Sequence, residues 1–83
     1  LMAALSQVDT SQEIRFLVKT PESQETAEIT IAGGQVSANT PEAFGFETSD
    51  LYLAAVVKNS PAEKAGLQKG DRLFQINDKP VLV

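Results

Sequence analysis

The stretch SPAEKAGLQKGDRLFQIND, residues 60–78, constrains the fold most strongly, because each of its turns has a residue suited to it. Ser60 is a favoured N-cap, and Pro61 suits the first position of an α-helix. Glu63 follows at the spacing of a capping box with Ser60. Gly66 can end the helix, since glycine adopts the left-handed conformation that closes many helices. The stretch therefore predicts a short helix with fixed ends.

The residues after this helix predict a turn and a strand. Gly70 and Asp71 form a turn signal, and RLFQIN (72–77) has the composition of a strand. Regular alternation would place Phe74 and Ile76 together on one face of that strand. Asp71 is expected to accept hydrogen bonds from backbone donors at the turn. The whole stretch is therefore expected to be a framework and not a catalytic centre.

Alternating apolar side chains predict two strands in the first half, at residues 13–20 and 26–33. The short polar loop between them favours an antiparallel hairpin. Before the hairpin, LMAALSQV (1–8) predicts the last turns of a helix, so the chain is expected to be a piece of a longer protein. In the second half, residues 51–59 predict a buried strand, with Val57 among the core residues.

Composition excludes several classes of function. The chain has 83 residues, enough for one small domain, and a net charge of −4. A nucleic-acid partner or an anionic membrane surface would need clustered Lys and Arg, so neither is expected. The chain has no cysteine and no histidine, which removes disulfides, thiol chemistry, the commonest general base and the commonest metal ligand. An independent enzyme is therefore not expected.

Residues 33–42, GGQVSANTPE, form the one linker-like stretch, with glycines, a proline and small polar residues. They separate residues 1–32 from residues 43–83. Neither side alone is long enough to fill a core. The two sides are therefore expected to make about one domain together.

Residues 60–81 resemble the most recognisable segment of PDZ domains, which are small peptide-binding modules. In that family a helix of the form S-P-A-x-x-A-G-L precedes x-x-G-D-x-I/L and a strand that ends in N-G. Asp78 stands where the family has glycine, and Asp tolerates the left-handed turn needed there. The matching residues are Ser60, Pro61, Ala62, Ala65, Gly66, Leu67, Gly70, Asp71 and Leu73, of which Ser60, Pro61, Gly66, Gly70 and Asp71 are the structural framework.

A second resemblance lies upstream, where AFGF (43–46) is similar to the carboxylate-binding loop of PDZ domains. Successive backbone N–H groups on a glycine-containing turn form a nest for an anion. The resemblance implies that this loop binds a peptide's terminal carboxylate and that the next strand pairs with the peptide. Phe44 and Phe46 could instead be core residues beside a turn. The implied peptide-binding residues are Ala43, Phe44, Gly45, Phe46, Glu47 and Thr48.

The PDZ resemblance implies an α+β fold, a small, partly open antiparallel β-barrel or sandwich with two helices. A PDZ domain usually places a longer helix and a hairpin after the segment that ends this chain. Two arrangements explain the difference: the chain joins the halves of two tandem domains, or it folds as one circularly rearranged domain. In the second arrangement residues 1–8 supply the groove helix, with Leu1 and Leu5 facing the peptide. A domain-swapped homodimer is a further expectation.

Residues 44–73 look like the second PDZ domain of bacterial site-2 proteases, which are intramembrane zinc metalloproteases. This resemblance implies a non-catalytic segment that controls substrate access by binding a protein C-terminus or an unfolded substrate segment. The parent enzyme would lie in the bacterial inner membrane, with this segment on the periplasmic side. Zinc is expected only in the parent enzyme, and no cofactor is expected in this chain. Periplasmic serine proteases, carboxy-terminal processing proteases and a type II secretion component carry similar domains. A PDZ segment of a periplasmic serine protease and a structural interaction module of a secretion system therefore stay open as alternatives.

Overall fold

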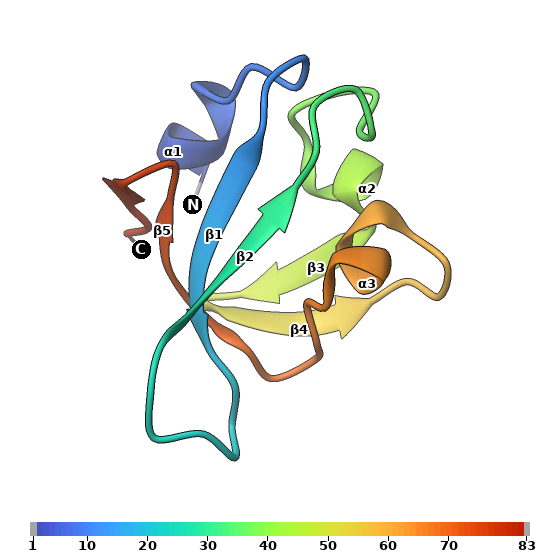
Figure 1. The fold of residues 1–83 in the computed structure, drawn as a ribbon. Coiled ribbons are helices and arrows are strands. Elements are labelled where there is room, and N and C mark those ends of the chain that lie inside the picture. Colours follow the sequence, from blue (N-terminus) through green and yellow to red (C-terminus); the bar gives the residue numbers. More distant parts are fainter. Residues whose placement is uncertain (1, 83) are drawn as a thin grey trace.

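The computed structural model describes residues 2–82, and its strands form one antiparallel sheet in the order β2-β1-β5-β4-β3, with β6 beside β5 (Figure 1). Strands from both sides of residues 33–42 join this sheet. The strands are β1 (Ile14–Lys19), β2 (Ala27–Ile31), β3 (Phe46–Ser49), β4 (Tyr52–Val56), β5 (Arg72–Ile76) and β6 (Lys79–Pro80). The helices are α1 (Met2–Ser6), α2 (Pro41–Phe44) and α3 (Pro61–Ala65).

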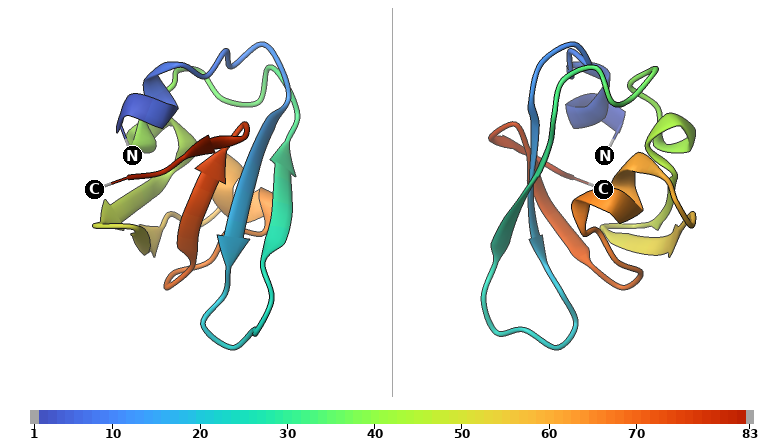
Figure 2. Two further views of the ribbon diagram at one scale, coloured as in Figure 1. Left: turned by 90° about the vertical axis from the view of Figure 1, so that its left-hand side faces the viewer. Right: turned by 45° about the vertical axis from the view of Figure 1, so that its right-hand side comes forward.

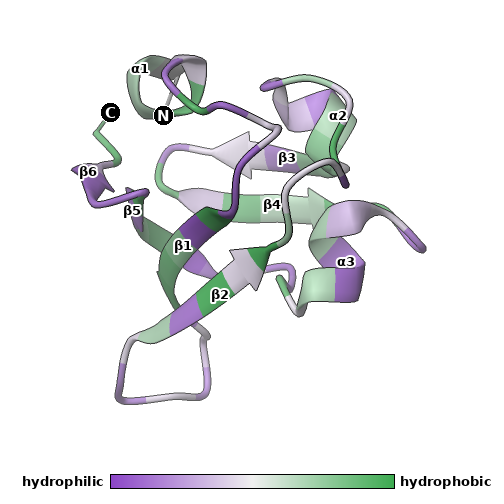
Figure 3. Ribbon diagram, turned by 45° about the horizontal axis from the view of Figure 1, so that its top comes forward, coloured by the Kyte–Doolittle hydropathy of each residue, from purple (hydrophilic) through white to green (hydrophobic). Residues whose placement is uncertain are grey.

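The sheet curls, so that α3, which follows β4, packs against β2 at the opposite edge (Figures 1 and 2). The tip of the β1–β2 hairpin projects away from the three helices in both views of Figure 2. This hairpin is antiparallel as predicted, with Ile14 opposite Ile31 and Val18 opposite Ala27. Apolar and polar residues alternate along β2 (Figure 3). Buried and half-buried residues alternate along β1, the pattern of a strand with one buried face.

Three aromatic rings occupy the centre of the core. Phe16 of β1 meets Phe44 and Phe46 edge-on, with ring centroids 5.7 and 6.3 Å apart, and the centroids of Phe44 and Phe46 are 5.6 Å apart. All three rings are buried. Because β1 comes from the first half and the other two rings from the second, the core joins the two halves of the chain.

The capping residues predicted for α3 are confirmed. Ser60 is the N-cap, and its Oγ accepts a hydrogen bond from the Glu63 backbone N–H at 3.2 Å. Gly66 ends the helix with φ 105°. The Glu63 carboxylate accepts from the backbone N–H of Asn59 at 2.8 Å instead of from that of Ser60. The reciprocal bond of the capping box is therefore displaced by one residue, because the Ser60 N–H already donates to the Val57 carbonyl.

Strand β5 departs from the predicted alternation. Leu17 pairs with Gln75 and Val18 pairs with Leu73, so the register shifts between them and Phe74 is left without a partner on β1. This bulge places Leu73 and Ile76 in the core, whereas Phe74 is half-buried on the other face, 4.5 Å from the Arg72 guanidinium. The expectation that Phe74 and Ile76 share a face was wrong, because a bulge inserts an extra residue into the repeat.

Two further expectations about side chains were wrong. Leu5 is fully buried in the core, so it does not face a peptide groove. Leu1, predicted to face the groove with it, lies outside the described residues. Val57 is 57% exposed instead of buried, because β4 ends at Val56 and the chain then turns toward α3. Leu53 of that strand is buried in the core, and Val56 is partly buried against it.

Candidate functional site

The segment that resembles a carboxylate-binding loop begins with a helix, α2, that was not predicted. Thr40 caps it with extended backbone, φ −118° and ψ 151°, and its Oγ1 accepts from the Ala43 N–H at 3.2 Å. Pro41 occupies the start of the helix, and Gly45 ends it with φ 91°. A threonine and proline followed closely by glycine repeat the signals that predicted α3, so the same capping rules could have found α2.

Formation of α2 uses the backbone donors of this segment. The Ala43 and Phe44 N–H groups donate to the Thr40 carbonyl at 3.1 and 3.2 Å, and the Gly45 N–H donates to the Pro41 carbonyl at 2.9 Å. A nest needs successive N–H groups that point together at an anion. In this structure the N–H groups of Ala43, Phe44 and Gly45 instead donate to carbonyls of α2 and its N-cap, so they are not directed at an anion.

The six residues implied to bind peptide lie in different environments. Phe44 and Phe46 are core residues, 0% and 2% exposed, as their alternative interpretation predicts. Ala43 is half-buried and packs against the core. Glu47 is exposed, and Thr48 is half-buried on β3.

Gly45, which ends α2, packs directly against Ser60, the N-cap of α3. A Cβ atom at Gly45 would collide with the Cβ and Oγ atoms of Ser60. The left-handed φ of 91° at Gly45 also disfavours any residue with a side chain. Glycine is therefore required here both by close packing and by backbone conformation.

Strand β3 is an edge of the sheet, because it pairs with β4 on one side alone. The Val57 N–H donates to the Gly45 carbonyl at 2.7 Å, and Phe46 stands opposite Val56 in the register. Hydrogen-bonded and non-hydrogen-bonded pairs alternate along antiparallel strands. The N–H and C=O of Phe46 therefore point away from β4, toward the free edge. An incoming strand would find its first backbone partner at Phe46.

A hollow of about 520 Å³ lies beside this edge. Four of the six implied residues line it, Ala43 and Phe44 do not, and Val57 adds an exposed apolar side chain. Pro41, Glu42 and Val57 are site residues that the resemblance did not imply. The residues that line the hollow are Pro41, Glu42, Gly45, Phe46, Glu47, Thr48 and Val57. None of residues 3–6 of α1, whose side chains the structure describes, is among them.

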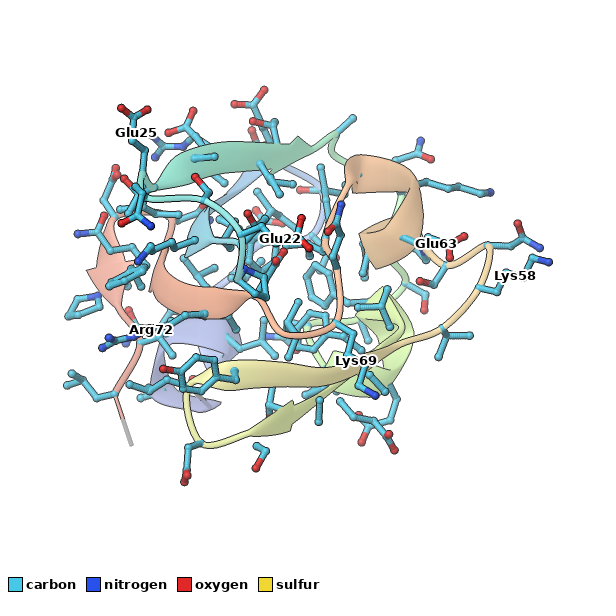
Figure 4. All side chains as sticks on the ribbon, turned by 90° about the horizontal axis from the view of Figure 1, so that it is seen from below. Glu22, Glu25, Lys58, Glu63, Lys69 and Arg72 are labelled. Carbon is cyan, nitrogen blue, oxygen red and sulfur yellow. The ribbon has the colours of Figure 1, made fainter. Side chains whose placement is uncertain are left out.

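The charges of the hollow are negative. Glu42 and Glu47 are both exposed, and no Lys or Arg lines it. Lys58, the next residue after Val57, lies out on the β4–α3 loop beside Glu63 (Figure 4). The hollow therefore combines an apolar surface, a free strand edge and two carboxylates.

The framework residues stand outside the hollow, and Asp71 has the structural role predicted for it. Asp71 is fully buried, its Oδ2 accepts from the Gln68 N–H at 3.0 Å, and its backbone carbonyl accepts from the Leu53 N–H at 2.8 Å. Its Oδ1 has no hydrogen-bond partner among residues 2–82. Burial raises the pKa of the Asp71 carboxyl, because the charged form loses its hydration.

Within residues 2–82 the structure has neither a metal-binding cluster nor a helix that could span a membrane. No cluster of three or more His, Cys, Asp or Glu side chains there could hold a metal ion. No helix within those residues has the length and apolar character needed to cross a membrane.

Comparison with known proteins detects a PDZ domain in the second half of the chain. A family model described as a PDZ domain matches residues 52–82, which include β4, α3, β5 and β6. No solved structure matches the chain. The arrangement of strands and short helices is a PDZ-like α+β fold, as predicted. Residues 43–48 lie before the matched range, so the peptide-binding role implied for them stays a prediction.

Proposed function

We propose that this chain is a non-catalytic regulatory module that binds a segment of another protein along the free edge of β3. A PDZ domain suggests a peptide-binding or regulatory role, and the single observation that carries the proposal is the outward-facing backbone of Phe46 beside an apolar hollow. An extended segment can add to such an edge as a further strand, with main-chain hydrogen bonds for affinity and a hollow for side chains.

The absence of His and Cys supports a role without catalysis, since the commonest general base and the strongest side-chain nucleophile are both missing. Such a module acts by holding or excluding a segment.

We further propose that the module belongs to a membrane-embedded zinc protease of the site-2 type and controls which substrates reach it. The support is the resemblance of residues 44–73 to the second PDZ domain of those enzymes. The zinc and catalytic residues would then lie in the parent enzyme, and this module would face the periplasm of a bacterium. A periplasmic serine protease or a secretion-system module is the alternative. Sequencing the complete reading frame distinguishes these parent proteins. An H-E-x-x-H motif in an apolar span would support the zinc protease, and a serine-protease triad would contradict it.

Peptide binding can be tested by titrating the isotope-labelled chain with short extended peptides and following its backbone amide signals. The proposal predicts shifts that are largest at Gly45, Phe46 and Glu47. Val57→Ser should weaken binding by about tenfold, because the complex loses roughly the free energy gained by burying one such apolar side chain. Tyr52→Ser is the matched control, because Tyr52 is also exposed but lies at the other end of β4. No shift at β3 with millimolar peptide would contradict the proposal.

Exchange of segments between two chains is a second, separate proposal about assembly. Residues 33–42 connect the two halves of the sheet and would act as the hinge. Light scattering should detect a dimer whose population rises with concentration. A monomer at every concentration would contradict this proposal and leave peptide binding unaffected.

A further inference from the structure

We infer that the hollow beside β3 takes the interior of an extended basic segment, one that carries Lys or Arg, and does not take a free carboxy terminus. The inference rests on the proposed function and specifies the chemistry of its ligand. It follows from three features of the site: its occupied amide groups, its charge, and the residues of α2 in its lining.

The amide groups that would hold a terminal carboxylate are already bonded. Ala43, Phe44 and Gly45 donate to the Thr40 and Pro41 carbonyls at 2.9 to 3.2 Å. A carboxylate placed there would have to break these bonds and unwind α2. The outward N–H of Phe46 is a single donor, and it is oriented for pairing with another strand.

The charge of the hollow opposes a carboxylate and favours a cation. Glu42 of α2 and Glu47 of β3 both line it, and no Lys or Arg of residues 2–82 does. A peptide carboxylate would add a third negative charge to this surface, whereas a Lys or Arg side chain would pair with either Glu. Complementary charge of this kind sets which partner is accepted more than it sets affinity.

The hollow does not end at the first residue of β3. Pro41 and Glu42 of α2 line it together with the residues of β3, and Glu42 is exposed. A segment paired with β3 would therefore also contact these residues of α2. Contact with both elements suits the interior of an extended chain, which continues beyond the residues that pair with β3.

Three peptides of one length and one apolar centre distinguish the outcomes. The first carries Lys beside the apolar residue and has acetyl and amide ends, the second replaces Lys by Glu, and the third is the first with a free carboxy terminus. Binding is measured from the amide shifts at Phe46 and Glu47. The amidated Lys peptide should bind at least as tightly as its free acid, and about twofold to fivefold more tightly than the Glu peptide, the range for exposed ion pairs.

Matched variants assign this preference to the hollow. Glu42→Gln and Glu47→Gln should reduce the difference between the Lys and Glu peptides and make it less sensitive to salt. Glu25→Gln is the control, since it changes the net charge equally but lies on the hairpin loop away from β3 (Figure 4). All three residues are exposed, so the variants should fold normally.

The results separate the two proposals. A free acid that binds more tightly than its amide, with no effect of Glu42→Gln or Glu47→Gln, overturns the inference and leaves the proposed function standing. No shift at β3 with any of the peptides overturns both.

Discussion

Gly45 and Ser60 pack so closely that any side chain at position 45 would collide with the Cβ and Oγ atoms of Ser60. Gly45 ends α2, and Ser60 is the N-cap of α3. The two short helices therefore meet at this contact. This contact therefore positions the first residue of β3, Phe46.

Gly45→Ala should lower the free energy of unfolding more than Gly34→Ala does. Both glycines have positive φ, 91° and 83°, so both variants carry the cost of a left-handed alanine, about 1–2 kcal/mol. A Cβ at Gly34 meets nothing within 4 Å, whereas one at Gly45 meets Ser60. The excess loss should be about 1–3 kcal/mol, measured by urea denaturation. Equal losses would show that the contact with Ser60 is not tight.

Ser60→Ala and Thr40→Ala should each lower the free energy of unfolding by about 1 kcal/mol, because each removes an N-cap acceptor. Ser49→Ala, at the exposed end of β3, is the control and should change it by less than about 0.5 kcal/mol. Denaturation of the three variants side by side tests this. An effect of Ser60→Ala as small as that of the control would contradict the capping role.

Asp71 should make the folded state less stable as pH rises. Its pKa is raised in the folded protein, so the folded state holds the proton more tightly than the unfolded chain does. The free energy of unfolding therefore falls as pH increases from the unfolded pKa through the raised folded pKa. Asp71→Asn removes this dependence and keeps an oxygen acceptor for the Gln68 N–H.

Urea denaturation of both proteins between pH 4 and 7 measures the difference. The wild type should gain stability relative to Asp71→Asn as pH falls. The lowered pKa of Asp9, which comes from its bonds with Ser11, acts in the opposite direction but is common to both proteins and cancels. A difference that does not change with pH would contradict the assigned environment of Asp71.

Phe16→Ala should cost about 3–5 kcal/mol of unfolding free energy, since its ring lies at the centre of the aromatic cluster. Phe74→Ala should cost much less, because the bulge in β5 keeps this ring out of the core. Thermal or urea denaturation distinguishes the two. Comparable losses would favour the regular alternation expected from sequence and contradict the bulge.

Local signals predicted much of the framework. The caps of α3 at Ser60 and Gly66, the hairpin of β1 and β2, and the hydrogen bond from the Gln68 N–H to Asp71 all depend on residues near one another in the chain. Caps and turns have mechanical causes that can be recognised in a short stretch of sequence.

Features set by packing between distant segments could not be predicted. The β5 bulge depends on its register with β1, and the exposure of Val57 depends on where β4 stops pairing with β3. The outward N–H of Phe46 likewise follows from the register with β4. Helix α2 was not predicted, although Thr40, Pro41 and Gly45 are local signals for it.

Hydrogen exchange at the Phe46 amide tests the central claim most directly. In the free protein this N–H points to an open edge, so it should exchange faster than the amides of Leu53 and Val57, which donate to the Asp71 and Gly45 carbonyls. Addition of a peptide that binds should slow exchange at Phe46 in proportion to occupancy. A Phe46 amide that is already protected in the free protein, or that stays fast when peptide is bound, would contradict strand addition at β3.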